Sequence, residues 1–370
     1  MSFKKLNIIQ PILEAINKVG YQTPTAIQEQ TIPHILQGRD LIGCAQTGTG
    51  KTASFAIPIL QLLNQKSSSK KVIRSLILTP TRELAIQINE NFKIYGEFLR
   101  LRHLAVFGGV PQKKQVVQLN RGVDILIATP GRLLDLLNQH CLDFSHVEIV
   151  VLDEADRMLD MGFVKDVKKI LTKIPSKRQT LFFSATMPIE IKKLALQIVR
   201  NPIEITVTPI SSTARTIKQS IYFVEKEEKL NLLFTILKDK SIKRSLVFAR
   251  TKHGADKLVK KLASMGIYTA AIHGNKSQNA RLKALNDFKN NRIRVLIATD
   301  IAARGIDIAE LPHVLNYELP NEPESYVHRI GRTGRAGVQG TAVSFCDEDQ
   351  LKDLKKIEKL IGFTIPVMSS

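Results

Sequence analysis

Short runs of valine, isoleucine and leucine alternate with amphipathic stretches along this chain. The runs VIRSLILTP (72–80), VDILIAT (123–129) and VEIVVLDE (147–154) have the nearly continuous apolar character of strands that are buried on both faces of a parallel sheet. The stretches ELAIQINENFKIYGEFL (83–99) and ADKLVKKLASMG (255–266) repeat their apolar residues at helical spacing. The alternation predicts an α/β fold with doubly wound parallel sheets.

Parts of this pattern occur twice. Arg74-Ser75-Leu76 recurs as Arg244-Ser245-Leu246, and LIAT (126–129) recurs at 296–299, in both cases 170 residues later. Two matches at one offset predict two domains of similar topology. A chance match between short words that are typical of strands is the alternative that these words alone leave open.

The length of 370 residues also suits two domains. The segment TVTPISSTART (206–216) is polar, contains Pro209 and lacks helical periodicity, which is typical of a flexible linker. We therefore expect a first domain at residues 1–207, a linker at 208–216, a second domain at 217–366 and a short tail at 367–370.

The charge balance is strongly basic. The chain has 54 Lys and Arg against 34 Asp and Glu, a formal net charge of +20, and each side of residue 207 carries +10 of it. An excess that is shared evenly favours a polyanion lying across both domains, although the net charge alone fits a basic solvated surface equally well.

Other bulk features exclude whole classes of protein. No apolar run approaches the roughly 18 residues of a membrane span, and the N-terminal segment lacks the apolar core of a signal peptide. The three cysteines are far apart, so no structural zinc site is predicted. A cytoplasmic protein is expected.

The segment RDLIGCAQTGTGKT (39–52) combines a strand, a glycine-rich turn and the start of a helix. Gly48 and Gly50 would let backbone amides turn toward phosphates, Lys51 would meet the β- and γ-phosphate charges, and the Thr52 hydroxyl suits Mg²⁺. The general phosphate-loop pattern has a glycine where this chain has Ala45. The segment predicts a nucleoside triphosphate site.

An acidic cluster, Asp153, Glu154 and Asp156, follows the apolar strand at 147–152. Taken alone, such a cluster is usually a solvated turn or a helix cap. In the same domain as a phosphate loop, it predicts that Asp153 holds Mg²⁺ together with Thr52, largely through water, and that Glu154 is the general base.

The word Asp153-Glu154-Ala155-Asp156 resembles the motif that names the DEAD-box RNA helicases, and the resemblance extends from Phe3 to about Gly362. The words RTKHGADKL, AIHGNKSQNAR and NYELPNEPESYVHRIGRTGRAG are most similar to the bacterial RhlE-type subgroup. AQTGTGKT is this family's form of the phosphate loop, which accounts for Ala45. The resemblance implies two RecA-like domains in tandem, as in the P-loop NTPases of helicase superfamily 2.

The resemblance also implies a set of ATP contacts. GYQTPTAIQ (20–28) is similar to the family's Q motif, in which the Gln28 amide would recognise adenine and Tyr21 would stack on it, with Phe3 as the upstream aromatic. Arg332 and Arg335 would be arginine fingers, which are worth about 10³ to 10⁵ in rate in comparable systems. The implied ATP-binding residues are Phe3, Tyr21, Gln28, Ala45, Gln46, Thr47, Gly48, Thr49, Gly50, Lys51, Thr52, Gly305, Asp307, Arg332 and Arg335.

A second implied set couples ATP hydrolysis to work on RNA. The hydroxyls of Ser184-Ala185-Thr186 would hydrogen-bond toward the acidic cluster, and the second domain would contribute residues from HRIGRTGR (328–335). The implied coupling residues are Asp156, Ser184, Thr186, His328 and Arg329.

The implied RNA contacts offer hydroxyl, guanidinium and backbone amide groups, which suit phosphates and the ribose 2′-hydroxyl better than base edges. Most follow the ends of expected strands, where ligands bind in such sheets. Plain surface or helix capping is the alternative for each Arg or Thr taken alone. The residues are Pro80, Thr81, Arg82, Gly108, Gly109, Thr129, Pro130, Gly131, Arg132, Arg250, Thr251, Gln278, Arg281, Thr299 and Arg304.

The resemblance therefore implies an ATP-dependent RNA helicase with little sequence preference, which closes its two domains on ATP and RNA and locally separates short duplexes. Ribosomal precursors or the RNA-decay machinery are the expected partners, and a monomer is expected. Two alternatives stay open, an ATP-gated RNA clamp that unwinds little and a DNA translocase on the same scaffold.

Overall fold

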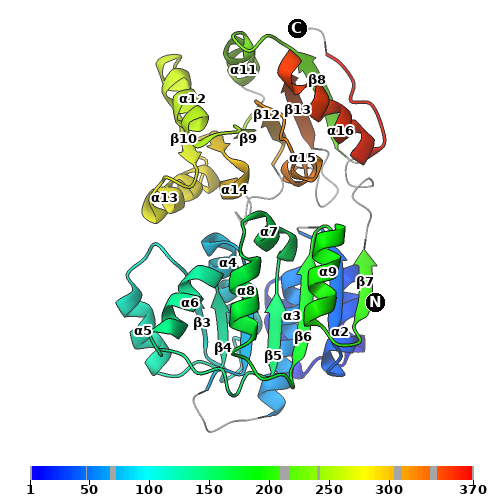
Figure 1. Cartoon of the computed structure of the whole chain (residues 1–370). Helices are drawn as coiled ribbons and strands as arrows, with labels where there is room; N and C mark the ends of the chain where they lie inside the picture. Colours follow the sequence, from blue (N-terminus) through cyan, green and yellow to red (C-terminus); the bar gives the residue numbers. More distant parts are fainter. Residues whose placement is uncertain are drawn as a thin grey trace. The chain divides into compact units, whose positions relative to one another are not determined.

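The computed structural model describes residues 2–46, 48–66, 72–207, 217–239, 242–303, 311–333 and 340–368. The chain divides into two compact units, Met1–Val207 and Thr208–Ser370 (Figure 1). The expected linker at 208–216 lies outside the described residues. No helix in these described ranges is both long and apolar enough to cross a membrane.

The first unit is built on a seven-stranded sheet in which every pairing is parallel, with the order β3-β4-β2-β5-β6-β1-β7. Its central strands are buried along their whole length, as the apolar runs of the sequence predict. The strands are β1 (Leu41–Ala45), β2 (Ser75–Leu78), β3 (His103–Val106), β4 (Ile125–Ala128), β5 (Ile149–Leu152), β6 (Gln179–Ser184) and β7 (Ile203–Val207).

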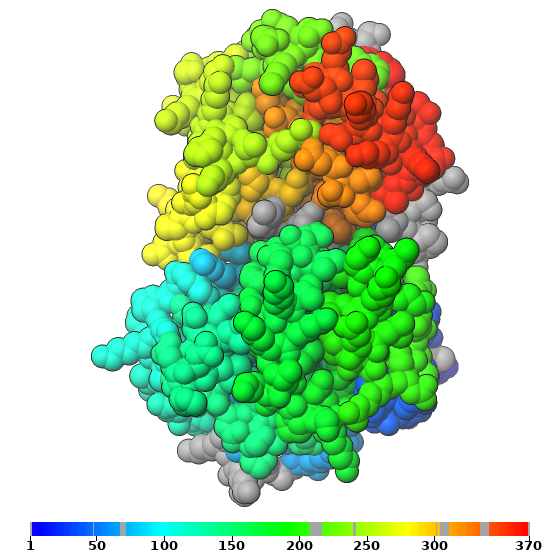
Figure 2. All heavy atoms as spheres, in the orientation of Figure 1, coloured from blue at the N-terminus to red at the C-terminus, as the bar shows by residue number. Residues whose placement is uncertain are grey.

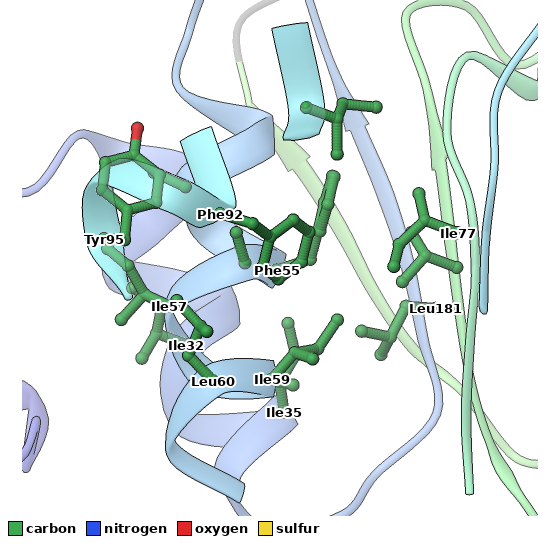
Figure 3. Packing of buried hydrophobic residues seen from close by; sticks show 14 of the residues in the cluster. Ile32, Ile35, Phe55, Ile57, Ile59, Leu60, Ile77, Phe92, Tyr95 and Leu181 are labelled. Carbon is green, nitrogen blue, oxygen red and sulfur yellow. The ribbon is translucent and has the colours of Figure 1, made fainter. Parts of the chain in front are cut away.

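Helices cover both faces of this sheet because successive strand residues point to opposite sides. Ile77 packs on the side of the first helices (Figure 3), whereas its neighbours Leu76 and Leu78 pack on the other. The first face carries η1 (Phe3–Leu6), α1 (Gln10–Lys18), α2 (Ala26–Leu36), α3 (Lys51–Gln65) and α4 (Arg82–Tyr95). The second carries α5 (Gln112–Asn120), α6 (Pro130–Asn138), α7 (Ala155–Asp160), α8 (Val164–Leu171) and α9 (Ile189–Ile198). In the space-filling view the side chains of α8 and α9, in green, hide the sheet behind them (Figure 2).

The second unit has a six-stranded parallel sheet with the order β10-β11-β9-β12-β13-β8. Its strands are β8 (Lys218–Phe223), β9 (Ser245–Phe248), β10 (Thr269–Ile272), β11 (Val295–Ala298), β12 (His313–Asn316) and β13 (Thr341–Cys346). One face packs on α11 (Lys229–Lys238) and α12 (Lys252–Ser264). The other packs on α13 (Gln278–Lys289), α14 (Asp300–Ala303), α15 (Pro323–Ile330) and, after the short η2 (Glu348–Gln350), α16 (Leu351–Ile361).

The strand order of the second unit repeats that of the first six strands of the first unit. The two segments that recur in the sequence lie in corresponding strands of the two units, β2 with β9 and β4 with β11. Their leucines are also register partners in both sheets, Leu76 with Leu126 and Leu246 with Leu296. The predicted doubly wound fold and its repeat are confirmed. The alternative, that the recurring motifs match by chance, is wrong.

The first residues of the expected tail at 367–370 pair with the second sheet. Val367 forms a parallel bridge with Ile221 of β8, and the Met368 amide donates to the Ile221 carbonyl at 2.8 Å. These residues pair with the edge strand β8, where unpaired backbone groups otherwise face solvent. Residues 369 and 370 lie outside the described residues.

The last turn of one helix in each unit is held by an arginine that precedes a strand. In the first unit the buried Arg74 donates to the Leu63 and Lys66 carbonyls at the end of α3, at 3.0 and 2.7 Å, and to Asp124 at 3.1 Å. In the second unit Arg294 donates to the Leu237, Asp239 and Ile242 carbonyls around the end of α11. Both side chains satisfy carbonyls that a helix leaves unpaired at its C-terminus.

We expect Arg74→Met to destabilise the first unit by about 3 kcal/mol, since it leaves Asp124 half-buried without its counter-charge. Arg294→Met is the matched control, because the described acceptors of Arg294 are all backbone carbonyls, and it should cost about 1 kcal/mol. Urea unfolding followed by circular dichroism suits a chain without tryptophan, and hydrogen exchange assigns the loss to a unit. Equal costs for the two variants would contradict the role given to Asp124.

Candidate functional site

The loop between β1 and α3 has the backbone that a phosphate site requires. Gly48 and Gly50 have φ angles of 86° and 93°, in the left-handed region that favours glycine. A Cβ at Gly50 would also overlap the Gln28 amide. α3 begins directly after Gly50 and runs for 15 residues, so its unpaired amides and dipole favour an anion at its start. Thr47 lies outside the described residues.

Lys51, the first residue of α3, is buried, and its ammonium donates to the carbonyl of Ala45 at the end of β1. The backbone of residue 45 makes this contact, so a methyl side chain leaves it intact. The contact with Lys51 therefore does not require the glycine that the general phosphate-loop pattern has at the position of Ala45.

Gln28 connects the start of α2 to the phosphate loop. Its Oε1 accepts from the Thr25 amide at 3.0 Å, as part of a capping box, and its Nε2 donates to the Gly50 carbonyl at 3.1 Å. An amide side chain has one more acceptor site and one more donor than these bonds use. The structure thus gives Gln28 a local role, and its predicted adenine contact stays a prediction.

The two aromatic residues expected near adenine lie in different surroundings. Tyr21 is 39% exposed, and its ring lies 6.0 Å from that of Tyr95, with the two hydroxyls 3.4 Å apart. Burial raises the pKa of Tyr95 above its usual value. Phe3 is buried in the hydrophobic cluster of α1 to α4, where it packs as a core residue.

The acidic cluster lies at the end of β5, and all three of its residues are buried. The Asp153 side chain accepts from the Glu154 amide at 3.0 Å. Burial raises the pKa of Asp153 to about 6, and the positive charge of Lys51 opposes this increase. Glu154 is the N-cap residue before α7 and has a left-handed φ of 52°, and its carboxylate pairs with the buried guanidinium of Arg157. A carboxylate with such a raised pKa beside a phosphate loop fits a site for a divalent cation, which would restore its charge.

Asp156 joins this cluster to the end of β6. Its Oδ2 accepts from both the amide and the hydroxyl of Thr186 at 2.9 Å, and its Oδ1 accepts from the Arg157 amide at 3.1 Å. Ser184 Oγ accepts from the Asp156 amide at 3.3 Å and donates to the Thr186 carbonyl at 2.7 Å. The hydrogen bonds expected between these hydroxyls and the acidic cluster are present.

Two arginines organise the loop after β3. The Arg82 guanidinium lies so close to Gly109, which has a φ of 78°, that a Cβ there would overlap it. Arg132 donates to Gln115 at 2.8 Å and to the Val110 carbonyl at 3.2 Å, and Gln115 in turn donates to the Phe107 carbonyl at 3.1 Å. These contacts connect α4, α5 and α6 to the loop after β3.

The other predicted RNA residues of the first unit occupy helix starts. Thr81 is the N-cap of α4 and accepts from the Leu84 amide at 3.3 Å, so capping, the alternative left open by the sequence, is one of its roles. Pro80 follows β2, and Thr129 and Pro130 open α6. A Cβ on Gly131 would meet none of the described atoms within 4 Å, which leaves room for a ligand.

In the second unit, Arg250 follows β9 and is held by acceptors from the loop after β12 and from α16. Its amide donates to Glu318 at 2.6 Å, and its guanidinium donates to the Leu319 carbonyl at 2.8 Å and to Asp353 at 3.1 Å. Thr251 caps α12 by accepting from the Gly254 amide at 3.0 Å. Gln278 opens α13 with Arg281 three residues later, and Thr299 follows β11.

Arg329 is only 1% exposed and is surrounded by acceptors of its own unit. It makes a two-pronged ion pair with Asp300, at 2.6 and 2.7 Å, and donates to Asn316 and to the Glu318 carbonyl. Its guanidinium also lies 4.9 Å from the centre of the Phe248 ring. Arg332 follows one turn later and is buried, and His328 is half-buried on α15. Arg304, Gly305, Asp307 and Arg335 lie outside the described residues.

Comparisons with known proteins decide which family this arrangement belongs to. Residues 25–194 match the model of the DEAD/DEAH box helicase family, and residues 228–337 match that of the helicase conserved C-terminal domain. The ATP-dependent RNA helicase CshA of Limosilactobacillus reuteri is 42% identical over 97% of this chain and 72% of that protein. The DEAD-box ATP-dependent RNA helicase CshA of Geobacillus kaustophilus is 42% identical over 97% of this chain and 76% of that protein.

This chain belongs to the DEAD-box ATP-dependent RNA helicase family.

A solved structure of this family supports the fold along the whole chain. S. cerevisiae Dbp5 bound to RNA and ADP BeF3 has a TM-score of 0.90 and 31% identity, and the match covers 99% of this chain and 95% of that one. The predicted tandem RecA-like fold is confirmed. The relatives above carry the name CshA, so the RhlE-type subgroup expected from the sequence is not confirmed.

Several residues of this DEAD-box site were not predicted from the sequence. Arg157 lies three residues after Glu154, and this helical spacing was the available signal for their ion pair. Gln115 and Asp300 are far in sequence from Arg132 and Arg329, the arginines that they hold. No local pattern marks such partners, because tertiary packing alone brings them together.

We expect Asp156→Ala to destabilise the first unit by about 3 kcal/mol, because it leaves two buried donors, the amide and the hydroxyl of Thr186, unpaired. Thr186→Val removes one of these donors together with its bond and should cost about 1 kcal/mol. Urea unfolding of both variants measures the difference. A smaller cost for Asp156→Ala than for Thr186→Val would show that Asp156 does not organise the cluster.

Proposed function

We propose that this DEAD-box protein is an RNA-stimulated ATPase that binds RNA without strong sequence preference and separates short duplexes locally. The observation that carries the proposal is that the charge of Lys51 acts on the buried carboxylate of Asp153, with the buried Glu154 next to it in the chain, at one edge of a parallel sheet. A phosphate-binding lysine and an acidic pair are the parts that phosphoryl transfer to water requires.

In this proposal each residue around ATP has a separate role in binding or hydrolysis. Gly48, Gly50 and the start of α3 present amides to the phosphates, and Lys51 neutralises their charge. Glu154, which Arg157 orients, accepts the proton of the attacking water. Arg332 and Arg335 would stabilise the charge of the transition state, Asp307 would contact the ribose and Gly305 would approach the nucleotide.

Thr52 and Asp153 are the proposed residues for Mg²⁺. When bound, the ion supplies charge neutralisation at the β- and γ-phosphates. Phe3, Tyr21 and Gln28 are proposed to contact adenine. The bond from Gln28 to the Gly50 carbonyl supports this assignment, since it ties the predicted adenine contact to the phosphate loop.

RNA is proposed to bind along the carboxyl edges of both sheets. The groups there are guanidiniums, hydroxyls and open glycine backbone, which contact phosphates and ribose rather than base edges. Arg82, Arg132 and Arg250 are already oriented by neighbouring acceptors or glycines, so little side-chain entropy is lost on binding.

We further propose residues 1–207 as the ATP-binding domain, 208–216 as a linker and 217–366 as the second helicase domain. ATP and single-stranded RNA would each contact both domains and so favour closure, with Asp156, Ser184, Thr186, His328 and Arg329 as coupling residues. Hydrolysis would release the RNA. A cytoplasmic monomer that acts on ribosomal precursors or in RNA decay stays a prediction. The RhlE-type subgroup stays a prediction that rests on the sequence motifs.

Glu154→Gln should retain ATP binding and lower RNA-stimulated hydrolysis by at least about 100-fold, because it removes the proton acceptor while preserving shape. Lys51→Ala is expected to weaken ATP binding itself. Phosphate release and the binding of a fluorescent ATP analogue separate the two effects. Turnover near the parent rate in Glu154→Gln would exclude this residue as the base.

ATP and RNA should bind cooperatively, with a coupling of about five- to 150-fold. The measurement is RNA affinity with and without a non-hydrolysable ATP analogue, and RNA and DNA of one sequence are compared as activators of the ATPase. An affinity that the analogue leaves unchanged contradicts closure on both ligands. Displacement of a short duplex separates the helicase from a clamp.

A further inference from the structure

One edge of the second unit carries most of that unit's positive charge. The segment from Lys252 to Arg294 contains ten Lys and Arg and only two acidic residues, Asp256 and Asp287. Its net charge of +8 compares with +10 for all residues after 207. The predicted RNA contacts account for Gln278 and Arg281 of this segment and leave most of its lysines without a role.

The segment forms α12, β10 and α13, which lie together at the outer edge of the sheet (Figure 1). β10 is the last strand of the sheet and pairs with β11 alone. The side chains of α12 and α13, in yellow-green and yellow, form the outer surface of the unit there (Figure 2).

The turn between α12 and β10 directs an aromatic ring outward. Gly266, with a φ of 82°, ends the helix, and the Ile267 amide donates back to the Leu262 carbonyl at 2.8 Å. Ile267 is buried, so the next side chain, Tyr268, points to the opposite side. Tyr268 is 79% exposed, the highest value among the described large hydrophobic side chains.

Exposed lysines of α12 precede this ring in the chain. Lys257, Lys260 and Lys261 occupy the last two turns of the helix, which end four residues before Tyr268. The acidic residues of the segment are engaged elsewhere, Asp256 with His273 and Lys276 at 3.0 and 2.9 Å, and Asp287 with Arg292 at 3.2 Å. Among the described carboxylates, none lies within 4 Å of these three lysines.

We propose that Lys257, Lys260, Lys261 and Tyr268, together called the Tyr268 surface, form a second RNA-binding surface. The lysines contact backbone phosphates, and the ring stacks on an unpaired base. This inference rests on the proposed function, since it assigns a further contact to the same RNA substrate.

The Tyr268 surface lies at the amino edge of the sheet, whereas Arg250, Gln278 and Thr299 lie at the carboxyl edge. α13 runs between the two edges, and its 12 residues span about 18 Å. An RNA that only fills the carboxyl-edge site therefore does not reach Tyr268. A longer RNA does, and gains affinity from the additional contacts.

The neighbours of Tyr268 favour RNA over a protein partner. A protein interface needs an apolar centre around its aromatic residues. The exposed residues that precede Tyr268 in the chain are the lysines of α12, Ala263, Ser264 and Gly266, and among them only Ala263 adds an apolar side chain, a small one. Cations around one exposed ring are what the backbone and an unpaired base of RNA require.

The test compares the RNA concentration that half-maximally activates the ATPase for a short and a long single-stranded RNA. Tyr268→Ala should raise this concentration for the long RNA by about fivefold or more, the loss expected for one stacked base. Lys260→Gln with Lys261→Gln should also lower the salt dependence of long-RNA binding, by about one unit of log–log slope for each phosphate that is no longer neutralised. Activation by the short RNA should not change in either variant.

The matched control is Lys355→Gln with Lys356→Gln, two exposed lysines of α16 that change the net charge equally. This control should keep the long-RNA advantage of the parent. An equal loss in the control, or an unchanged advantage in both surface variants, would overturn the proposal, and the latter result would favour an acidic protein as the partner. Failure of the short RNA to activate the parent protein would instead refute the proposed function.

Discussion

The parallel direction of every strand is the constraint on which both units depend. In each sheet all carboxyl ends meet at one edge, and a helix follows each strand from β1 to β6 and from β8 to β13. The phosphate loop follows β1, the acidic cluster follows β5, and Ser184 ends β6. Residues more than a hundred positions apart thereby become neighbours, and the bonds from Asp156 to Ser184 and Thr186 connect β5 with β6.

Gathering these groups at a sheet edge buries charge, and specific partners compensate it. Glu154 has Arg157, Asp156 accepts three donors, and Arg329 has Asp300 with two further acceptors. Removing one partner of such a group costs more than the pair contributes, because the other is left charged in an apolar interior. These networks hold the functional side chains in one geometry before any ligand binds.

The two units use one topology for different chemistry. The first unit places a glycine-rich loop and carboxylates at its carboxyl edge, whereas the second places arginines there, with Arg250 and Arg329 held by acidic or carbonyl partners. Lysines that have none of these roles lie at the opposite edge of the second sheet, in the Tyr268 surface. Such a division suits a substrate that is a long polyanion, because a long polyanion extends past the site where chemistry takes place.

The sequence by itself determined the doubly wound fold, its repeat, and the loop and acidic cluster of the ATP site. Local periodicity and the positions of glycines predict those features. The φ angles near 90° at these glycines are ones that other residues rarely adopt. Only the tertiary structure decided that Gln28 bonds to Gly50, that Gln115 holds Arg132 and that Arg329 lies buried against Asp300. It also showed that Thr81 and Thr251 cap helices and that Val367 pairs with β8. These contacts join residues through packing between elements, and a side chain's local sequence does not specify which distant acceptor it will meet.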